Sequence, residues 1–176
     1  MSASITVEIT KGAREDRVTV TRAAGAALSF QFPKKGPLPH DAVHYVVESV
    51  MGLQQAFWGR MAAGQSPDSI QQLAHAGGHP SAKRAGKPAA DIVEMLQAER
   101  LVECLEADAW SGGAGDLATF GEVYAAACAQ SGVAPLLLDE QHLARLRAGM
   151  EELARQWASG SYRFTFLGLR RAAGKV

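Results

Sequence analysis

Apolar and polar residues alternate in three short segments over the first third of the chain. In residues 4–10 every second residue is a branched apolar one, so one side of an extended backbone is apolar and the other polar. Residues 17–22 and 28–32 repeat this alternation, and runs of small residues that favour turns separate the three segments. This spacing predicts an antiparallel β-meander with one apolar face that helices must cover.

After Pro39 the apolar residues recur at helical spacing instead. A first helix is expected from Pro39, whose missing N–H suits the first helical turn, to about residue 63. Gly52 and Gly59 are the positions where this helix is expected to bend or break, because glycine weakens a helix interior. A short helix is expected over residues 66–75.

Three further helices are expected in the second half of the chain. They are predicted at residues 91–110, from Asp116 or Thr119 to about Gln130, and from Asp139 to Trp157. Residues 162–167 then alternate once more and can return as a strand to the opening sheet. The sequence therefore predicts an α+β fold, in which an N-terminal antiparallel β-meander, which a C-terminal strand can join, packs against about four α-helices.

The length of 176 residues fits a single domain spanning residues 1–176, because one hydrophobic core grows comfortably to that size. Within it, residues 76–90 are rich in glycine, proline, alanine and lysine, and we expect a mobile surface loop there. Cys104 and Cys128 fall in apolar helical patterns without CxxC spacing, which favours two buried, reduced thiols over a disulfide.

Composition excludes the simplest binding functions. The chain carries 18 Lys and Arg against 18 Asp and Glu, so no global positive charge makes nucleic acid a favoured partner. Residues 1–10 lack the apolar core of a signal peptide, and no apolar run approaches the ~18 residues of a membrane span. We therefore expect a cytoplasmic protein without a membrane partner.

The charges are nevertheless placed unevenly. Residues 89–122 contain eight acidic residues and a single Arg100. Such a segment is typical of a solvated acidic face, but it also needs cations close by, either as side chains from elsewhere in the fold or as a metal ion.

Two histidines near the start of the first long helix are the first candidates for chemistry. His40, His44 and Glu48 recur at intervals of four residues, which places them along one side of that helix. Histidines at this spacing can share a metal ion, because their Cβ atoms lie only about 6 Å apart. The H-D-x-x-H pattern has Asp41 where the metalloprotease motif has glutamate, so it is not that motif. Asp41 also suits the helix N-terminus for electrostatic reasons alone.

The segment from Leu38 to Gly64, LPHDAVHYVVESVMGLQQAFWGRMAAG, resembles a group of small uncharacterised bacterial proteins. Members of this group share a similar H-D-x-x-H-Y-x-V-E-x-x-x-G segment after an N-terminal strand pair. The resemblance brings no established activity with it. It implies where to look for function, namely at His40, Asp41, His44, Tyr45 and Glu48, with Gly52 and Gly59 shaping the helix.

Three glutamates on the helix predicted at residues 91–110 are the second group of candidates. Glu99, Glu103 and Glu106 fall within about 60° of one another around that helix, next to apolar residues that face the core. A carboxylate buried there must be paired, protonated or bound to a metal. If the two helices pack together, their nitrogen and oxygen ligands suit a divalent ion such as Zn, Mn or Fe.

Residues 75–87 give weaker signals. His75 and His79 also stand four apart, but the glycines and proline around them make a regular helix unfavourable. Lys83, Arg84 and Lys87 form a basic trio that is either a solvated loop or a phosphate contact.

The sequence leaves three hypotheses open. In the first, the histidines and glutamates form a buried polar network without catalysis. In the second, a metal-dependent hydrolase holds a divalent ion with residues drawn from His40, His44, Glu48, Glu99, Glu103 and Glu106, and Asp41 or Glu48 takes a proton from the bound water. In the third, a partner-binding or nucleic-acid adaptor uses the basic trio.

Overall fold

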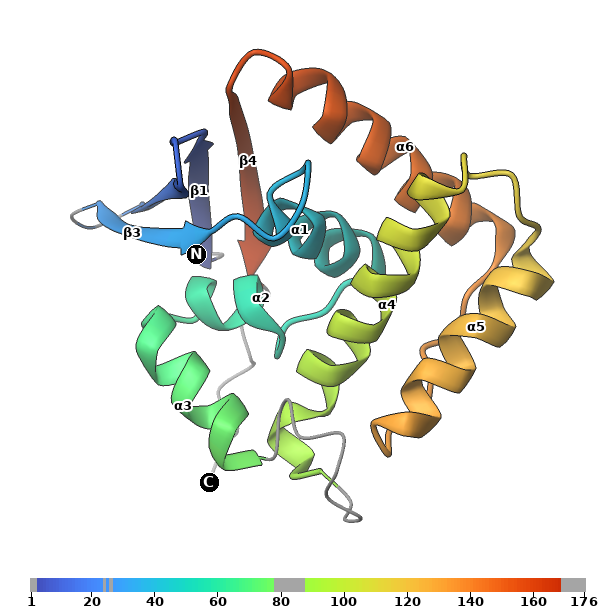
Figure 1. Ribbon diagram of the computed structural model, residues 1–176. Coiled ribbons are helices and arrows are strands. Elements are labelled where there is room, and N and C mark those ends of the chain that lie inside the picture. Colours follow the sequence, from blue (N-terminus) through green and yellow to red (C-terminus); the bar gives the residue numbers. More distant parts are fainter. Residues whose placement is uncertain (1–2, 24, 26, 78–87, 169–176) are drawn as a thin grey trace.

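Four strands form a single antiparallel sheet in the computed structural model, which describes residues 3–23, 25, 27–77 and 88–168. The strands are β1 Ala3–Thr10, β2 Glu15–Arg22, β3 Leu28–Pro33 and β4 Ser161–Gly168, in the order β3-β2-β1-β4 (Figure 1). The predicted meander and the returning C-terminal strand are therefore both confirmed.

The alternating sequence explains why this sheet has one buried and one exposed face. Val7 of β1 lies opposite Val20 on β2 and Phe164 on β4, so apolar side chains from three strands share one face. Tyr162 and Phe166 extend the same face along β4. The intervening positions of the sheet carry mainly threonine, serine and charged residues that point to solvent.

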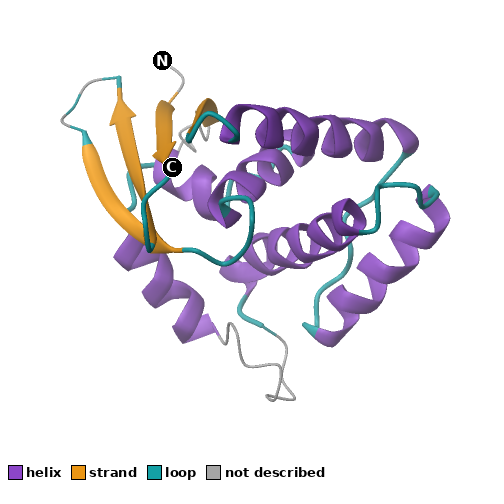
Figure 2. Ribbon diagram, turned by 45° about the horizontal axis from the view of Figure 1, so that its top comes forward, coloured by secondary structure: helices purple, strands orange, loops and turns teal. Residues whose placement is uncertain are grey.

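Six α-helices and one short 3₁₀ helix occur in the described parts of the chain, and they lie on the apolar side of the sheet (Figures 1 and 2). They are α1 His40–Met51, α2 Phe57–Ala62, α3 Pro67–Gly77, η1 Ala90–Ile92, α4 Val93–Trp110, α5 Leu117–Gln130 and α6 Glu140–Trp157. Helices α1, α2 and α6 contact the sheet, α4 packs on α1, and α5 packs on α4. The α+β class is confirmed.

The described helices outnumber the predicted four because the helix expected from Pro39 to about residue 63 is two helices. Gly52 adopts φ 68° and ends α1, as predicted, and the chain re-enters a helix only at Phe57. Gly59 lies inside α2, so the prediction of a break there is wrong, and the short helix expected at residues 66–75 is α3. The alternatives for the start of α5 are also decided, since the Asp116 carboxylate accepts the backbone N–H of Thr119 at 2.8 Å.

The loop predicted for residues 76–90 falls mostly on residues 78–87, which lie outside the described residues together with His79 and the basic trio. Its flanks differ from the prediction, because α3 continues through Gly77 and η1 begins at Ala90. Cys104 and Cys128 are buried free thiols, as expected. Among the described helices, none has the length and apolar character needed to cross a membrane.

Helices α1 and α6 pack closely because α6 has no side chain at Gly149. A Cβ atom at this position would lie 2.5 Å from Cγ1 of Val46, which is buried in α1 and has no room to move. This close approach helps to fix α1, the helix that carries both histidines.

We expect Gly149→Ala to lower the free energy of unfolding by about 1–3 kcal/mol, since overpacking outweighs the better helix propensity of alanine. Gly121→Ala on α5 is the matched control. A Cβ there meets no atom within 4 Å, so its stability should be unchanged or up to about 1 kcal/mol higher. Urea unfolding of both variants checks the pair. Equal effects at the two sites would mean that α1 and α6 are not tightly packed.

Candidate metal centre

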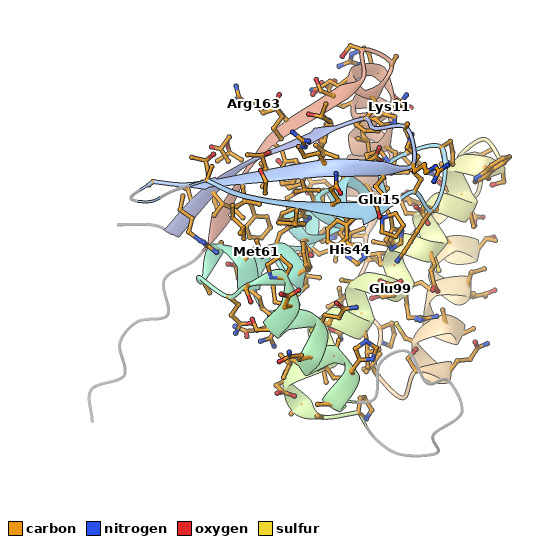
Figure 3. All side chains as sticks on the ribbon, turned by 60° about the vertical axis from the view of Figure 1, so that its left-hand side comes forward. Lys11, Glu15, His44, Met61, Glu99 and Arg163 are labelled. Carbon is orange, nitrogen blue, oxygen red and sulfur yellow. The ribbon has the colours of Figure 1, made fainter. Side chains whose placement is uncertain are left out.

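Two histidines of α1 face one glutamate of α4 where these helices pack. His40 and His44 stand one turn apart, with ring centroids separated by 4.9 Å. Nε2 of His44 lies 3.0 Å from Oε2 of Glu99, and Nε2 of His40 lies 3.6 Å from Oε1 of the same carboxylate. One ligand atom from each of the three residues falls within 4.8 Å of the other two. Figure 3 places His44 and Glu99 on the helix-covered side of the sheet.

A second pair of carboxylates lies against the other nitrogens of the two rings. Nδ1 of His40 is 3.3 Å from Oε1 of Glu106, and Nδ1 of His44 is 3.8 Å from Oε1 of Glu48. Both imidazoles therefore direct Nε2 towards Glu99 and Nδ1 towards another carboxylate. Of the two Nδ1 contacts, only that of His40 with Glu106 is a hydrogen bond, and in metal sites of proteins such a bond orients the histidine ring and fixes its tautomer.

Glu48 is held in place by the helix that follows its own. Its side chain has no exposed surface, and Oε2 accepts the backbone N–H groups of Trp58 at 2.8 Å and Gly59 at 3.1 Å, in the first turn of α2. Burial raises the pKa of Glu48 to about 8, although these backbone N–H groups favour the charged form. Its other oxygen, Oε1, has no hydrogen-bond partner among the described residues.

The turn between α1 and α2 brings these backbone groups to Glu48. A Cβ at Gly59 would lie 2.3 Å from the carbonyl oxygen of Gln54, so only glycine fits. Oε2 of Glu94 accepts the N–H groups of Gln54 at 2.9 Å and Gln55 at 2.6 Å. Arg60 is buried and donates from Nε to the Gln55 carbonyl at 2.7 Å, and from its guanidinium to the carbonyl of Asp91. The turn is therefore tied to α4 and to the segment before it.

The charges of the cluster perturb one another. Burial opposes the charged form of Glu99, but hydrogen bonds from His40 and His44 outweigh it and hold the pKa of Glu99 well below its usual range. Burial likewise opposes the charged form of His40, yet Glu106 and Glu99 raise its pKa to about 9. The carboxylates of Glu99 and Glu106 therefore stabilise positive charge on the His40 imidazole.

Of the other candidates from the sequence, Glu103 and His75 lie outside this group, whereas Asp41 interacts with it. The Glu103 side chain is 44% exposed and pairs with Arg100 at 2.7 Å, so the structure does not bring it into the group around Glu99. Burial raises the pKa of Asp41, whose charge interacts with both histidines. His75 lies on α3, outside the group.

Sequence reasoning did not identify Glu94 or Arg60 as important. The signal for Arg60 was present, because it is a charged residue within the apolar stretch FWGRMA. Comparisons with protein-family models, curated proteins and solved structures give no match to this chain. The resemblance of residues 38–64 to the bacterial group therefore stays a prediction, and the chemistry must be argued from the geometry.

We expect Glu48→Ala to destabilise the protein by about 3 kcal/mol or more, because two buried backbone N–H groups lose their acceptor and a cavity remains. Glu48→Gln keeps an amide oxygen at the same place and should lose only about 1 kcal/mol. Urea unfolding monitored by tryptophan fluorescence measures both. If the two variants were equally destabilised, the hydrogen bonds that Glu48 accepts from these N–H groups would not be its main contribution to stability.

Proposed function

We propose that the protein binds one divalent metal ion through Nε2 of His40, Nε2 of His44 and the carboxylate of Glu99, and uses it for hydrolysis. The observation that carries this proposal is the convergence of three ligand atoms within 4.8 Å, with a further carboxylate behind each histidine. Two nitrogens and one oxygen are a ligand set that Zn takes in catalytic sites, and that Mn and Fe also accept.

The separations of the ligand atoms support this assignment. Metal–ligand bonds of about 2.1 Å at tetrahedral angles separate neighbouring ligand atoms by roughly 3.4 Å. The two nitrogen–oxygen distances, 3.0 Å from His44 to Oε2 of Glu99 and 3.6 Å from His40 to Oε1, lie on either side of that value. The nitrogens of the two histidines therefore approach the Glu99 carboxylate at separations close to those of ligands that share an ion.

A metal-free polar network is the competing function for the same residues. The 3.0 Å contact between His44 and Glu99 favours it, because this is a good hydrogen-bond length. However, Nε2 of His40 is buried without a hydrogen-bond partner among the described residues. An ion bound at this atom would satisfy it, whereas a network that served stability alone leaves it unpaired, so this atom favours the metal hypothesis.

The remaining chemistry follows from the number of ligands. Three protein ligands leave a coordination position for water, whose pKa a bound metal lowers. A carboxylate must then accept the proton of that water. Glu48 lies on the Nδ1 side of the His44 ring, away from the Nε2 atoms that would hold the ion. Asp41 interacts electrostatically with both histidines, so it is the one of the two candidate bases that we propose for this role.

We expect protein purified without chelator and without immobilised-metal chromatography to contain about one equivalent of Zn, Mn or Fe by plasma mass spectrometry. His44→Ala and Glu99→Gln should abolish this content. His142→Ala should retain the metal, because His142 lies on α6 and pairs with Asp139. Restoring metal at 100 times its Kd should stabilise the stripped protein by about 2.7 kcal/mol. Empty protein that gains no stability from any of the three metals would overturn the proposal.

We expect Glu106→Gln to weaken metal binding by about 10–100-fold, because the carboxylate that orients His40 is lost while the side-chain shape is kept. Glu103→Gln is the matched control on the same helix, since Glu103 pairs with Arg100 instead, and its metal affinity should change less than about twofold. Competition with a chromophoric chelator measures both affinities. If metal affinity fell equally in the two variants, Glu106 would not orient His40, and the loss of a negative charge on α4 would account for the change.

A further inference from the structure

A cavity of about 320 Å³ opens beside the proposed metal centre. It lies between the segment that leads into α1 and the C-terminal end of α4. Its walls include Lys35, Leu38, Glu106, Trp110 and Met150. The volume falls at the lower end of the range for small-molecule sites, so a small organic molecule fits but a large cofactor does not.

Glu106 connects this cavity to the metal centre. Glu106 lines the cavity, and its Oε1 lies 3.3 Å from Nδ1 of His40. The chain segment that lines the cavity at Leu38 is separated from His40 by Pro39 alone. A molecule in the cavity therefore lies on the Nδ1 side of His40, whose Nε2 faces the proposed ion.

The walls indicate what kind of molecule binds. Leu38, Trp110 and Met150 provide apolar surface, and the indole of Trp110 is 80% exposed although large aromatic side chains are normally covered. Lys35 is the only basic residue among those that line the cavity in the described part of the chain. The one acidic residue, Glu106, is already engaged by His40. A single ammonium group beside apolar walls matches a monoanion better than a multiply charged phosphate.

We propose that this cavity binds the organic part of the substrate, a small carboxylate with an aromatic or branched aliphatic body. The body packs against Trp110, Leu38 and Met150, and the carboxylate accepts a hydrogen bond from Nζ of Lys35. Calling this molecule a substrate rests on the proposed metal function. Its binding does not, and can be measured on protein with or without metal.

Ligand-observed NMR titration with phenylacetate, compared with its neutral isostere phenylacetamide, tests the site on the full chain. We expect saturable binding of phenylacetate, at least about tenfold stronger than that of the amide, because a hydrogen bond between charged groups is lost in the amide. Lys35→Gln and Trp110→Ala should each weaken phenylacetate about tenfold. Lys34→Gln is the matched control, because Lys34 does not line the cavity and faces Asp16 at 3.8 Å; its affinity should be unchanged.

The outcomes separate this proposal from the metal function. Absent or unsaturable binding, or equal binding of acid and amide, overturns the carboxylate site even where the protein holds a metal. Insensitivity to Lys35→Gln and Trp110→Ala places the ligand elsewhere and also overturns it. If the protein binds the carboxylate but takes up no metal, the metal function is overturned and the bound molecule is not a substrate. The cavity then remains a ligand site.

Discussion

The buried carboxylate of Glu48 is the contact on which both the fold around α1 and the candidate site depend. One of its oxygens fixes the first turn of α2, which packs on β1 and β4, and the other faces Nδ1 of His44. Removing a carboxyl group completely from water is unfavourable, and it is tolerated because backbone N–H groups supply hydrogen bonds in place of solvent. The same residue therefore holds α2 against α1 and places a carboxylate oxygen beside a histidine that faces Glu99.

Carboxylates in the acidic segment of residues 89–122 likewise bind groups from other parts of the fold. The acidic residues of this segment do not form one solvated face, because several of them have partners on other elements. Glu94 binds backbone groups of the α1–α2 turn, Glu99 and Glu106 face the histidines, and Asp108 forms a two-point ion pair with Arg147 of α6. The positive partners expected from the charge asymmetry are thus mostly side chains and N–H groups of the fold. Helix α4 acts as the element to which α1, the α1–α2 turn and α6 are all tied.

The periodicity of the sequence was sufficient to predict the sheet and most of the helices, because the burial of every second or every third to fourth residue is a local property. It also brought His40, His44 and the glutamates of α4 together as candidates. It did not separate Glu103 from Glu106, because both lie on the same side of a helical projection. Their partners come from other positions, Arg100 on the same helix and His40 on α1, and only the packing of α1 on α4 decides which one reaches a histidine. The role of Arg60 was missed for the same reason, since its acceptors lie in a turn and before α4.

The exposure of the cluster shows from which side a substrate would approach. Side-chain exposure rises from 0% at Glu48 through 12% at His44 and 21% at Glu99 to 35% at Glu106. The closed end lies under the α1–α2 turn, and the open end lies where α1 begins, next to the cavity that carries Lys35 and Trp110. An ion at Nε2 of the histidines would thus be shielded on one side, where low solvent access strengthens its electrostatic effect. Glu106 is the most exposed of these four residues, and it is the one that the proposed metal centre and the proposed ligand cavity have in common.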